Sequence, residues 1–193
     1  MYINSLYTWI FVLLFLGWSL SELFGPVQWS KRREAREKTN HDRRSLILAM
    51  IVGVSSLVLS LLFPLFLSWS RILWQLFWIG VILVFLGTTL RWYAIQTLGK
   101  LFTAQVIVQH DQEIVQRGPY QYMRHPSYTG FLLIISGFGL MIGSWLSMLL
   151  LTLSLGATLL YRISVEEQAL LQQCPTYKSY MQNTTKRLLP FLY

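Results

Sequence analysis

The sequence predicts an all-α integral membrane protein with about five transmembrane helices, the last two forming a helical hairpin. Of its 193 residues, 54% are hydrophobic and only 12% are charged, about half the share of roughly 25% that is typical of soluble domains. The charged residues also cluster, so that four long stretches contain no Asp, Glu, Lys or Arg. A helix needs about 20 mostly apolar residues to cross a bilayer, and each stretch is at least close to that length.

The first three uncharged stretches each predict one span. They are 1–21, 45–70 and 72–90. No basic segment precedes the first stretch and one follows it, so we expect a retained anchor and not a cleaved signal peptide. Residues 1–98 would then form a unit of three spans with a basic cytoplasmic loop at 25–45.

The fourth uncharged stretch, 126–161, predicts a hairpin. As one helix it would extend about 54 Å at ~1.5 Å per residue, too long for a single crossing of a ~30 Å hydrocarbon core. Gly143 and Ser144 lie at its midpoint, where we expect the chain to fold back. With the connection before it and the tail after it, the hairpin forms a second region, 99–193.

The basic residues predict the orientation, because Lys and Arg favour the cytoplasmic ends of spans. With the N-terminus outside and the C-terminus cytoplasmic, every Lys and Arg except Arg71 lies in a cytoplasmic segment. Topology therefore accounts for the net charge of +8, and we expect membrane lipids and no nucleic acid as partners.

The sequence does not favour a disulfide or a metal site. Cys174 is the only cysteine, so neither an intramolecular disulfide nor a thiolate metal cluster can form. The three histidines are His41, His110 and His125, far apart in sequence, and we expect no metal site. Motifs typical of a dinucleotide fold, a P-loop or a hydrolase nucleophile elbow are absent from the sequence.

Polar residues concentrate in two segments, 99–128 and 161–180. Both adjoin the hairpin on its predicted cytoplasmic side, so we expect them to meet in space. Pro126 suits the first position of a helix because it needs no donor there. The N-terminus of that helix would favour an anion beside Arg124 and His125. The alternative is an interfacial anchor, in which the Tyr and Arg side chains reach lipid headgroups.

At the other end of the hairpin, Arg162 and Glu166 are four residues apart and share a face if the helix continues past the membrane. Glu167 would point about 100° away. The alternative is a simple ion pair beside a solvated acid. Charges at the mouth of a hairpin are costly to bury and are often functional when they face inward.

From about residue 98 to 191, the sequence resembles the isoprenylcysteine carboxyl methyltransferases and the related membrane phospholipid methyltransferases. The resemblance rests on GPYQYMRHPSYTG at 118–130, then Arg162, the Glu166-Glu167 pair and Leu170. It implies a membrane enzyme that uses S-adenosylmethionine and releases S-adenosylhomocysteine. The cofactor pocket would be made by the connection before the hairpin and the hairpin's cytoplasmic ends.

The resemblance also implies site residues. The implied cofactor contacts are Gln105, His110, Gln112, Glu113, Ile114, Val115, Tyr120, His125, Pro126, Ser127, Tyr128 and Glu166. His110 and Gln112 are alternatives, because relatives commonly have a His at the position that Gln112 occupies here. Arg162 and Glu166 are the implied catalytic residues, with Arg162 facing the methyl acceptor.

This implied chemistry is physically coherent. The methionine carboxylate of the cofactor would suit the helix N-terminus beside His125, its ammonium would suit Glu166, and adenine would suit a wall of Tyr120 and Val115. A carboxylate acceptor is already ionised at neutral pH, so no general base is needed. Arg162 could orient that carboxylate through its planar guanidinium.

Three functions follow in order of support. The first is methylation of the carboxylate of an isoprenylcysteine-like or other lipophilic acceptor at the cytoplasmic face, in the cell membrane of a prokaryote or the endoplasmic reticulum of a eukaryote. The second is N-methylation of a phospholipid amine such as phosphatidylethanolamine. The third is a non-enzymatic small transporter, which predicts charges buried within the spans, where Glu22 is the only candidate.

Overall fold

The described part of the chain is helical. The computed structural model describes residues 5–24, 40–67, 75–102 and 114–188. Its helices are α1 (Ser5–Phe24), α3 (Asn40–Phe66), α4 (Gln75–Leu98), α5 (Pro126–Met141), α6 (Trp145–Gln173) and α7 (Tyr177–Asn183), with 3₁₀ turns η2 (Gly99–Leu101) and η3 (Gly118–Gln121). No strand occurs in these ranges, and the predicted all-α class is confirmed.

Each predicted span corresponds to one long helix. Three of them, Ile47–Phe66 within α3, α4 and α6, are long and apolar enough to cross a membrane. The apolar parts of α1 and α5 are shorter, Leu6–Glu22 and Pro126–Met141. The exact number of spans and their orientation stay predictions.

Four helices, α1, α3, α4 and α6, run further than the uncharged stretches predict, and α4 and α6 do so by the largest margin. α4 continues to Leu98 and α6 continues to Gln173. Uncharged stretches mark where a helix can lie in lipid, but a helix continues wherever its polar side chains find partners. The extension of α6 carries Arg162, Glu166 and Glu167 on one continuous helix.

The hairpin turn lies where the sequence predicts it. Gly143 has a φ of 79°, in the left-handed region that glycine adopts without steric cost. The Ser144 side chain caps α6 by accepting a hydrogen bond from the Ser147 amide at 3.3 Å. The two arms are close, since a β-carbon on Gly139 would lie 2.5 Å from the Met148 α-carbon.

Glycines allow α4 and α5 to pack with their backbones in contact. A β-carbon on Gly80 would lie 2.6 Å from the Gly137 carbonyl oxygen, and one on Gly87 would lie 2.6 Å from the Gly130 carbonyl oxygen. Positions seven apart lie on nearly the same helix face, so both pairs belong to one interface. Small residues at such interfaces let membrane helices approach closely.

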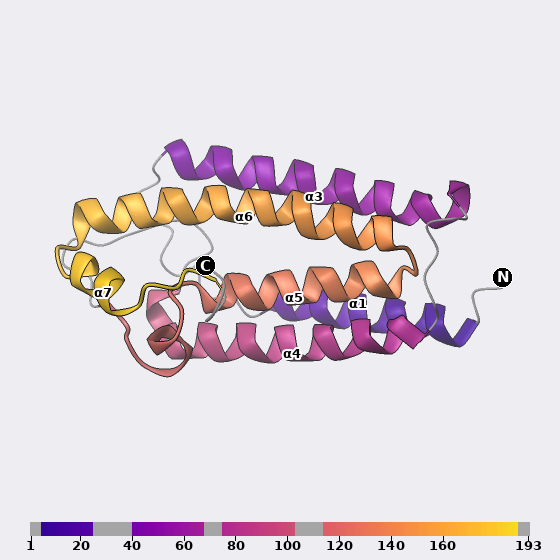
Figure 1. Ribbon diagram of the computed structural model, residues 1–193, viewed down its shortest axis with the longest axis horizontal. Coiled ribbons are helices and arrows are strands. Elements are labelled where there is room, and N and C mark those ends of the chain that lie inside the picture. Colours follow the sequence, from indigo (N-terminus) through magenta and orange to yellow (C-terminus); the bar gives the residue numbers. More distant parts are fainter. Residues whose placement is uncertain (1–4, 25–39, 68–74, 103–113, 189–193) are drawn as a thin grey trace.

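The helices form two connected groups (Figure 1). α1, α4 and α5 enclose an apolar core of Phe77, Val84, Ile134, Phe138 and Met141, covered by aromatic side chains of α1. α3 lies along α6, and serines join the two. The Ser56 hydroxyl donates to Ser154 Oγ at 2.8 Å, and the Ser147 hydroxyl donates to the Ser60 carbonyl at 2.7 Å.

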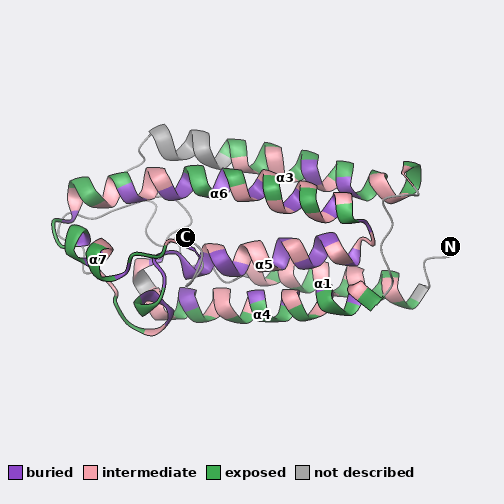
Figure 2. Ribbon diagram, viewed as in Figure 1, coloured by how far each residue is buried: buried purple, intermediate pink, exposed green. Residues whose placement is uncertain are grey.

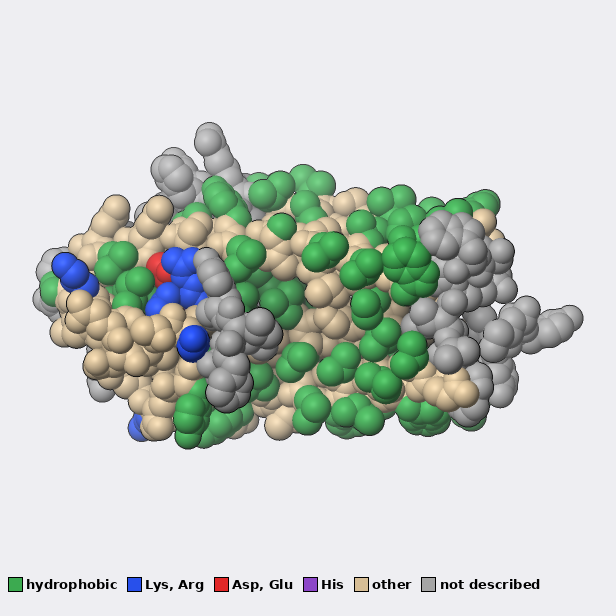
Figure 3. Space-filling model, viewed as in Figure 1, with side chains coloured by type: hydrophobic (Ala, Val, Ile, Leu, Met, Phe, Trp, Pro, Cys, Tyr) green, Lys and Arg blue, Asp and Glu red, His purple; other side chains and the backbone are tan. Residues whose placement is uncertain are grey.

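Exposed residues line the outer faces of the helices (Figure 2), and many of them are large and apolar. Examples are Leu13 at 66%, Val54 at 65% and Phe85 at 60% exposure. In the view of Figure 3, hydrophobic side chains spread over the flank, and Lys, Arg and Glu side chains gather at the α7 end. Exposed apolar surface of this extent indicates contact with lipid, and the protein is an integral membrane protein.

The α4–α5 contact generates a stability prediction. We expect Gly137→Ala to lower the melting temperature of the detergent-purified protein, because its β-carbon would lie 2.6 Å from the Gly80 carbonyl oxygen. Overpacking of this kind costs about 1–3 kcal/mol. The matched control is Gly17→Ala in α1, where a β-carbon meets nothing within 4 Å. Equal melting temperatures for the two variants would contradict the importance of this contact.

Candidate active site

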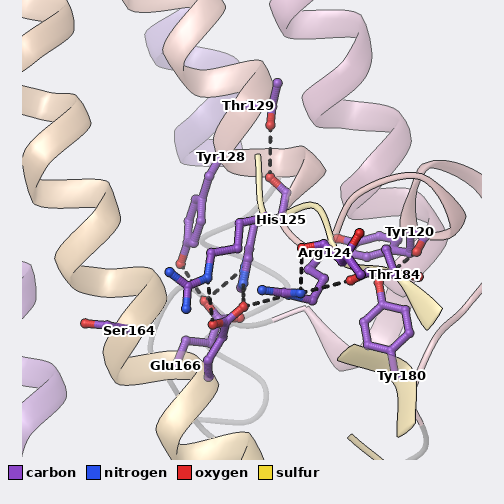
Figure 4. A network of polar contacts seen from close by, with 12 residues as sticks. Tyr120, Arg124, His125, Tyr128, Thr129, Ser164, Glu166, Tyr180 and Thr184 are labelled. Carbon is purple, nitrogen blue, oxygen red and sulfur yellow. Dashed lines mark hydrogen bonds and ion pairs between the residues drawn. The ribbon is translucent and has the colours of Figure 1, made fainter. Parts of the chain in front are cut away.

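The candidate site lies at the α7 end of the bundle. Four segments meet there: η3, the first turn of α5, the end of α6 and the tail after α7. Figure 4 shows the side chains of Tyr128, His125 and Arg124 pointing toward Glu166 and its neighbour, with Tyr120 and Tyr180 to one side. The two polar segments expected to meet at the ends of the hairpin therefore do so.

Glu167 is a buried carboxylate with three basic partners. Arg124 Nε donates to Glu167 Oε1 at 2.8 Å, and both side chains are 5% exposed. His125 Nε2 lies 3.2 Å from the same oxygen, and Arg187 Nε lies 3.1 Å from Oε2. Charge-assisted hydrogen bonds of this kind offset the cost of removing a carboxylate from water. The alternative of a solvated acid is wrong for Glu167.

Glu166, the next residue, faces a different set of groups. The Tyr128 hydroxyl donates to Glu166 Oε2 at 2.9 Å, and His125 Nδ1 lies 3.9 Å from that oxygen. The His125 and Tyr128 rings are stacked, with centroids 5.6 Å apart and planes at 11°. The Glu166 side chain is 31% exposed, so its carboxylate remains accessible to a ligand.

Arg162 lies one helical turn before Glu166 and is buried. The positive charge of its guanidinium acts on the Tyr128 hydroxyl, which places the two side chains near one another. The predicted grouping of Arg162, Glu166, His125 and Tyr128 therefore exists in the structure. A buried guanidinium beside a phenol and a carboxylate is suited to binding a second carboxylate through its planar N–H donors.

Two buried tyrosines form a neutral wall. The Tyr180 hydroxyl donates to the Tyr120 carbonyl oxygen at 2.7 Å. Burial raises the pKa of Tyr180 to about 12. Burial, and then the negative charge of Glu166, raise the pKa of Tyr120 well above its ordinary value. Both phenols therefore stay protonated at neutral pH.

The tail after α7 covers the segment that leads into α5. The backbone amides of Arg124 and His125 donate to the carbonyls of Lys186 and Arg187, each at 2.9 Å. Arg124 Nη1 donates to the carbonyls of Thr184 and Thr185 at 2.9 and 3.0 Å. The Thr129 hydroxyl donates to the Leu188 carbonyl. The anion expected at this terminus would find these two amides and the Arg124 side chain already satisfied.

The remaining predicted residues are placed as follows. Pro126 and Ser127 are buried in the first turn of α5, and Ile114 and Val115 are half-buried. Ile114 packs against the cluster of Cys174, Tyr177 and Tyr180. Four of the residues implied by the resemblance lie outside the described residues: Gln105, His110, Gln112 and Glu113. Within the described ranges, no group of three or more His, Cys, Asp or Glu could hold a metal ion.

Comparisons with known proteins identify proteins that are similar to this chain. The model of the isoprenylcysteine carboxyl methyltransferase family matches residues 79–172, a range that includes α5, nearly all of α6, and the site residues His125, Tyr128 and Glu166. The probable protein-S-isoprenylcysteine O-methyltransferase of Oryza sativa subsp. japonica is 28% identical over 188 residues, 95% of this chain and 96% of the relative. Protein-S-isoprenylcysteine O-methyltransferase B of Arabidopsis thaliana is 32% identical over 127 residues, 65% of this chain and 63% of the relative.

A solved structure is also similar. It is that of the eukaryotic intramembrane Ras methyltransferase ICMT, with a TM-score of 0.73 and 25% identity. The match covers 96% of this chain and 66% of that chain, so this chain spans about two thirds of the length of that protein.

These relatives are membrane methyltransferases of one kind. They favour carboxyl methylation over phospholipid N-methylation and over transport as the function of this chain. The family model, the curated relatives and the solved structure show that this chain is similar to the isoprenylcysteine carboxyl methyltransferase family.

Proposed function

We propose that the protein transfers a methyl group from S-adenosylmethionine to the carboxylate of an isoprenylcysteine or a similar lipophilic acceptor. The observation that carries the proposal is the junction of Tyr128, Glu166 and Arg162 at the polar end of the α5–α6 hairpin. There, an accessible carboxylate and a buried guanidinium lie one helical turn apart. The carboxylate suits a cationic part of the methyl donor, and the guanidinium suits an anionic acceptor.

The residues present fit the proposed cofactor. Glu166, whose side chain is 31% exposed, offers an anionic carboxylate that can bind an ammonium group. Tyr120 offers a buried neutral ring, and Val115 offers an apolar side chain, and both suit adenine. S-adenosylmethionine, when bound, supplies an electrophilic methyl group on a sulfonium. Tyr128 and His125 would hold Glu166 in place through the contacts described above.

Arg162 would bind and orient the acceptor carboxylate. That carboxylate is ionised at neutral pH, so it can attack the methyl group without a general base. The contribution of the chain is then alignment of donor and acceptor and exclusion of water. The buried position of Arg162 supports this, because an ionic contact is stronger where water is excluded.

The lipid part of the acceptor would enter sideways from the bilayer. The exposed apolar flanks of the bundle offer generic surface for a prenyl tail. The distribution of basic residues supports a site that faces the cytoplasm, in the cell membrane of a prokaryote or the endoplasmic reticulum of a eukaryote.

Cofactor binding is tested by titrating the detergent-purified protein with S-adenosylhomocysteine. We expect saturable binding by the wild type and a loss of tenfold or more, about 1.4 kcal/mol, in Glu166→Gln, because the neutral amide binds the ammonium less well. Gln168→Ala is the control, since Gln168 is exposed on the same helix. Wild-type affinity in Glu166→Gln, or no binding by a folded wild type, would contradict the proposed pocket.

The acceptor is tested with a synthetic S-farnesylcysteine whose amine is blocked and whose carboxylate is free. We expect methyl ester formation, and we expect Arg162→Lys to raise KM for this acceptor by roughly tenfold, the loss of one good charged contact. The affinity of Arg162→Lys for S-adenosylhomocysteine should change little. The matching carboxamide should not react. Methylation of phosphatidylethanolamine vesicles, with the farnesylcysteine unreacted, would instead support the phospholipid amine as acceptor.

A further inference from the structure

An ion pair joins the first helix to the rest of the bundle. Arg91 in α4 contacts the Glu22 carboxylate in α1 with two nitrogens, Nε to Oε1 at 2.5 Å and Nη2 to Oε2 at 2.7 Å. The two side chains are 12% and 22% exposed. A bidentate pair has a fixed geometry, and in a site with little water it is a strong constraint.

The same guanidinium also contacts α5. Arg91 Nη1 donates to the Ser127 carbonyl at 3.2 Å, and the guanidinium carbon lies 5.5 Å from the centroid of the Phe131 ring. The backbones are close here, since a β-carbon on Gly130 would lie 2.8 Å from the Arg91 amide nitrogen. One side chain therefore connects α1, α4 and the first turn of α5.

That turn of α5 carries the candidate site. Ser127 immediately precedes Tyr128, whose hydroxyl donates to Glu166. Arg91 is also among the charges that act on the Tyr120 hydroxyl. The Arg91–Glu22 pair thus lies next to the proposed cofactor pocket, although no described residue of α1 forms part of that pocket.

We propose that Arg91 and Glu22 are positioning residues that set the geometry of the cofactor pocket through the first turn of α5. The inference rests on the proposed function. Glu22 fixes the Arg91 guanidinium, and Arg91 holds the Ser127 carbonyl, so that Tyr128 meets Glu166. The first helix then takes part in cofactor binding in addition to anchoring the protein.

Loss of the Glu22 charge has a defined physical consequence. In Glu22→Gln the Arg91 guanidinium loses its counter-charge in a poorly hydrated place, which is unfavourable. It would turn toward water and release the Ser127 carbonyl. The start of α5 would then be held by the tail and by Glu167, with the Tyr128–Glu166 contact less well defined.

The control must separate positioning from general stability. Phe11→Ala removes a ring that packs against Phe138 at 5.7 Å between centroids, on the same helix as Glu22 but three turns away. It should lower the melting temperature by weakening the α1–α5 contact. It should leave the affinity for S-adenosylhomocysteine within about twofold, because the pair is intact.

The experiment measures binding of S-adenosylhomocysteine to the full chain in lipid nanodiscs, for Glu22→Gln, Tyr128→Phe, the double variant and Phe11→Ala. We expect Glu22→Gln to weaken binding by roughly tenfold. The double variant should bind little worse than Tyr128→Phe alone, because both changes act through one contact. Arg91→Lys keeps the charge but loses the two-point contact, so it should also weaken the binding of S-adenosylhomocysteine. This variant replaces Glu22→Gln in the experiment if Glu22→Gln does not fold.

Two results would overturn the inference. One is wild-type affinity in Glu22→Gln or, where that variant does not fold, in Arg91→Lys. The other is a loss of affinity in Glu22→Gln that adds fully to the loss in Tyr128→Phe and is no larger than the loss in Phe11→Ala. The Arg91–Glu22 pair would then only stabilise the fold. Absence of binding by the wild type would instead contradict the proposed function.

Discussion

The buried carboxylate of Glu167 is the constraint on which the site depends. Its three basic partners come from segments far apart in the chain: Arg124 and His125 before the hairpin, and Arg187 in the tail. Removing a carboxylate from water costs several kcal/mol, so Glu167 is stable only when these partners are in place. The connection, α6 and the tail therefore assemble together, and the site has one arrangement.

This arrangement separates the tasks of two adjacent acids. Consecutive helix positions point about 100° apart, so Glu167 can face the protein interior while Glu166 stays partly open to solvent. The side-chain exposures, 5% for Glu167 and 31% for Glu166, agree with this division. His125 lies between the two and links the buried network to the accessible carboxylate.

The sequence predicted the features that depend on local physics. Long uncharged stretches predict helices, Gly143 and Ser144 mark the turn, and the hairpin ends bring Arg162 and Glu166 toward His125 and Tyr128. It did not predict which of the two acids is buried, nor that the tail covers the segment that leads into α5, because both depend on partners tens of residues away. The extension of α6 past Tyr161 has the same origin. The acidic side chains of this extension are stable there because Arg124 and Arg187 form ion pairs with Glu167. The Tyr128 hydroxyl donates a hydrogen bond to Glu166.

The placement of the polar contacts in the fold suits the proposed reaction. An ionised acceptor needs no proton transfer, so catalysis depends on holding two reactants in line. The polar contacts at the site hold side chains in fixed positions, and the glycine contacts between α4 and α5 bring Arg91 within reach of Ser127. A polar site at one end of an apolar bundle would allow a lipid tail to remain in the bilayer while its carboxylate is aligned. The sequence property that first indicates a membrane protein, charge gathered at one end of uncharged helices, is thus the property that the chemistry requires.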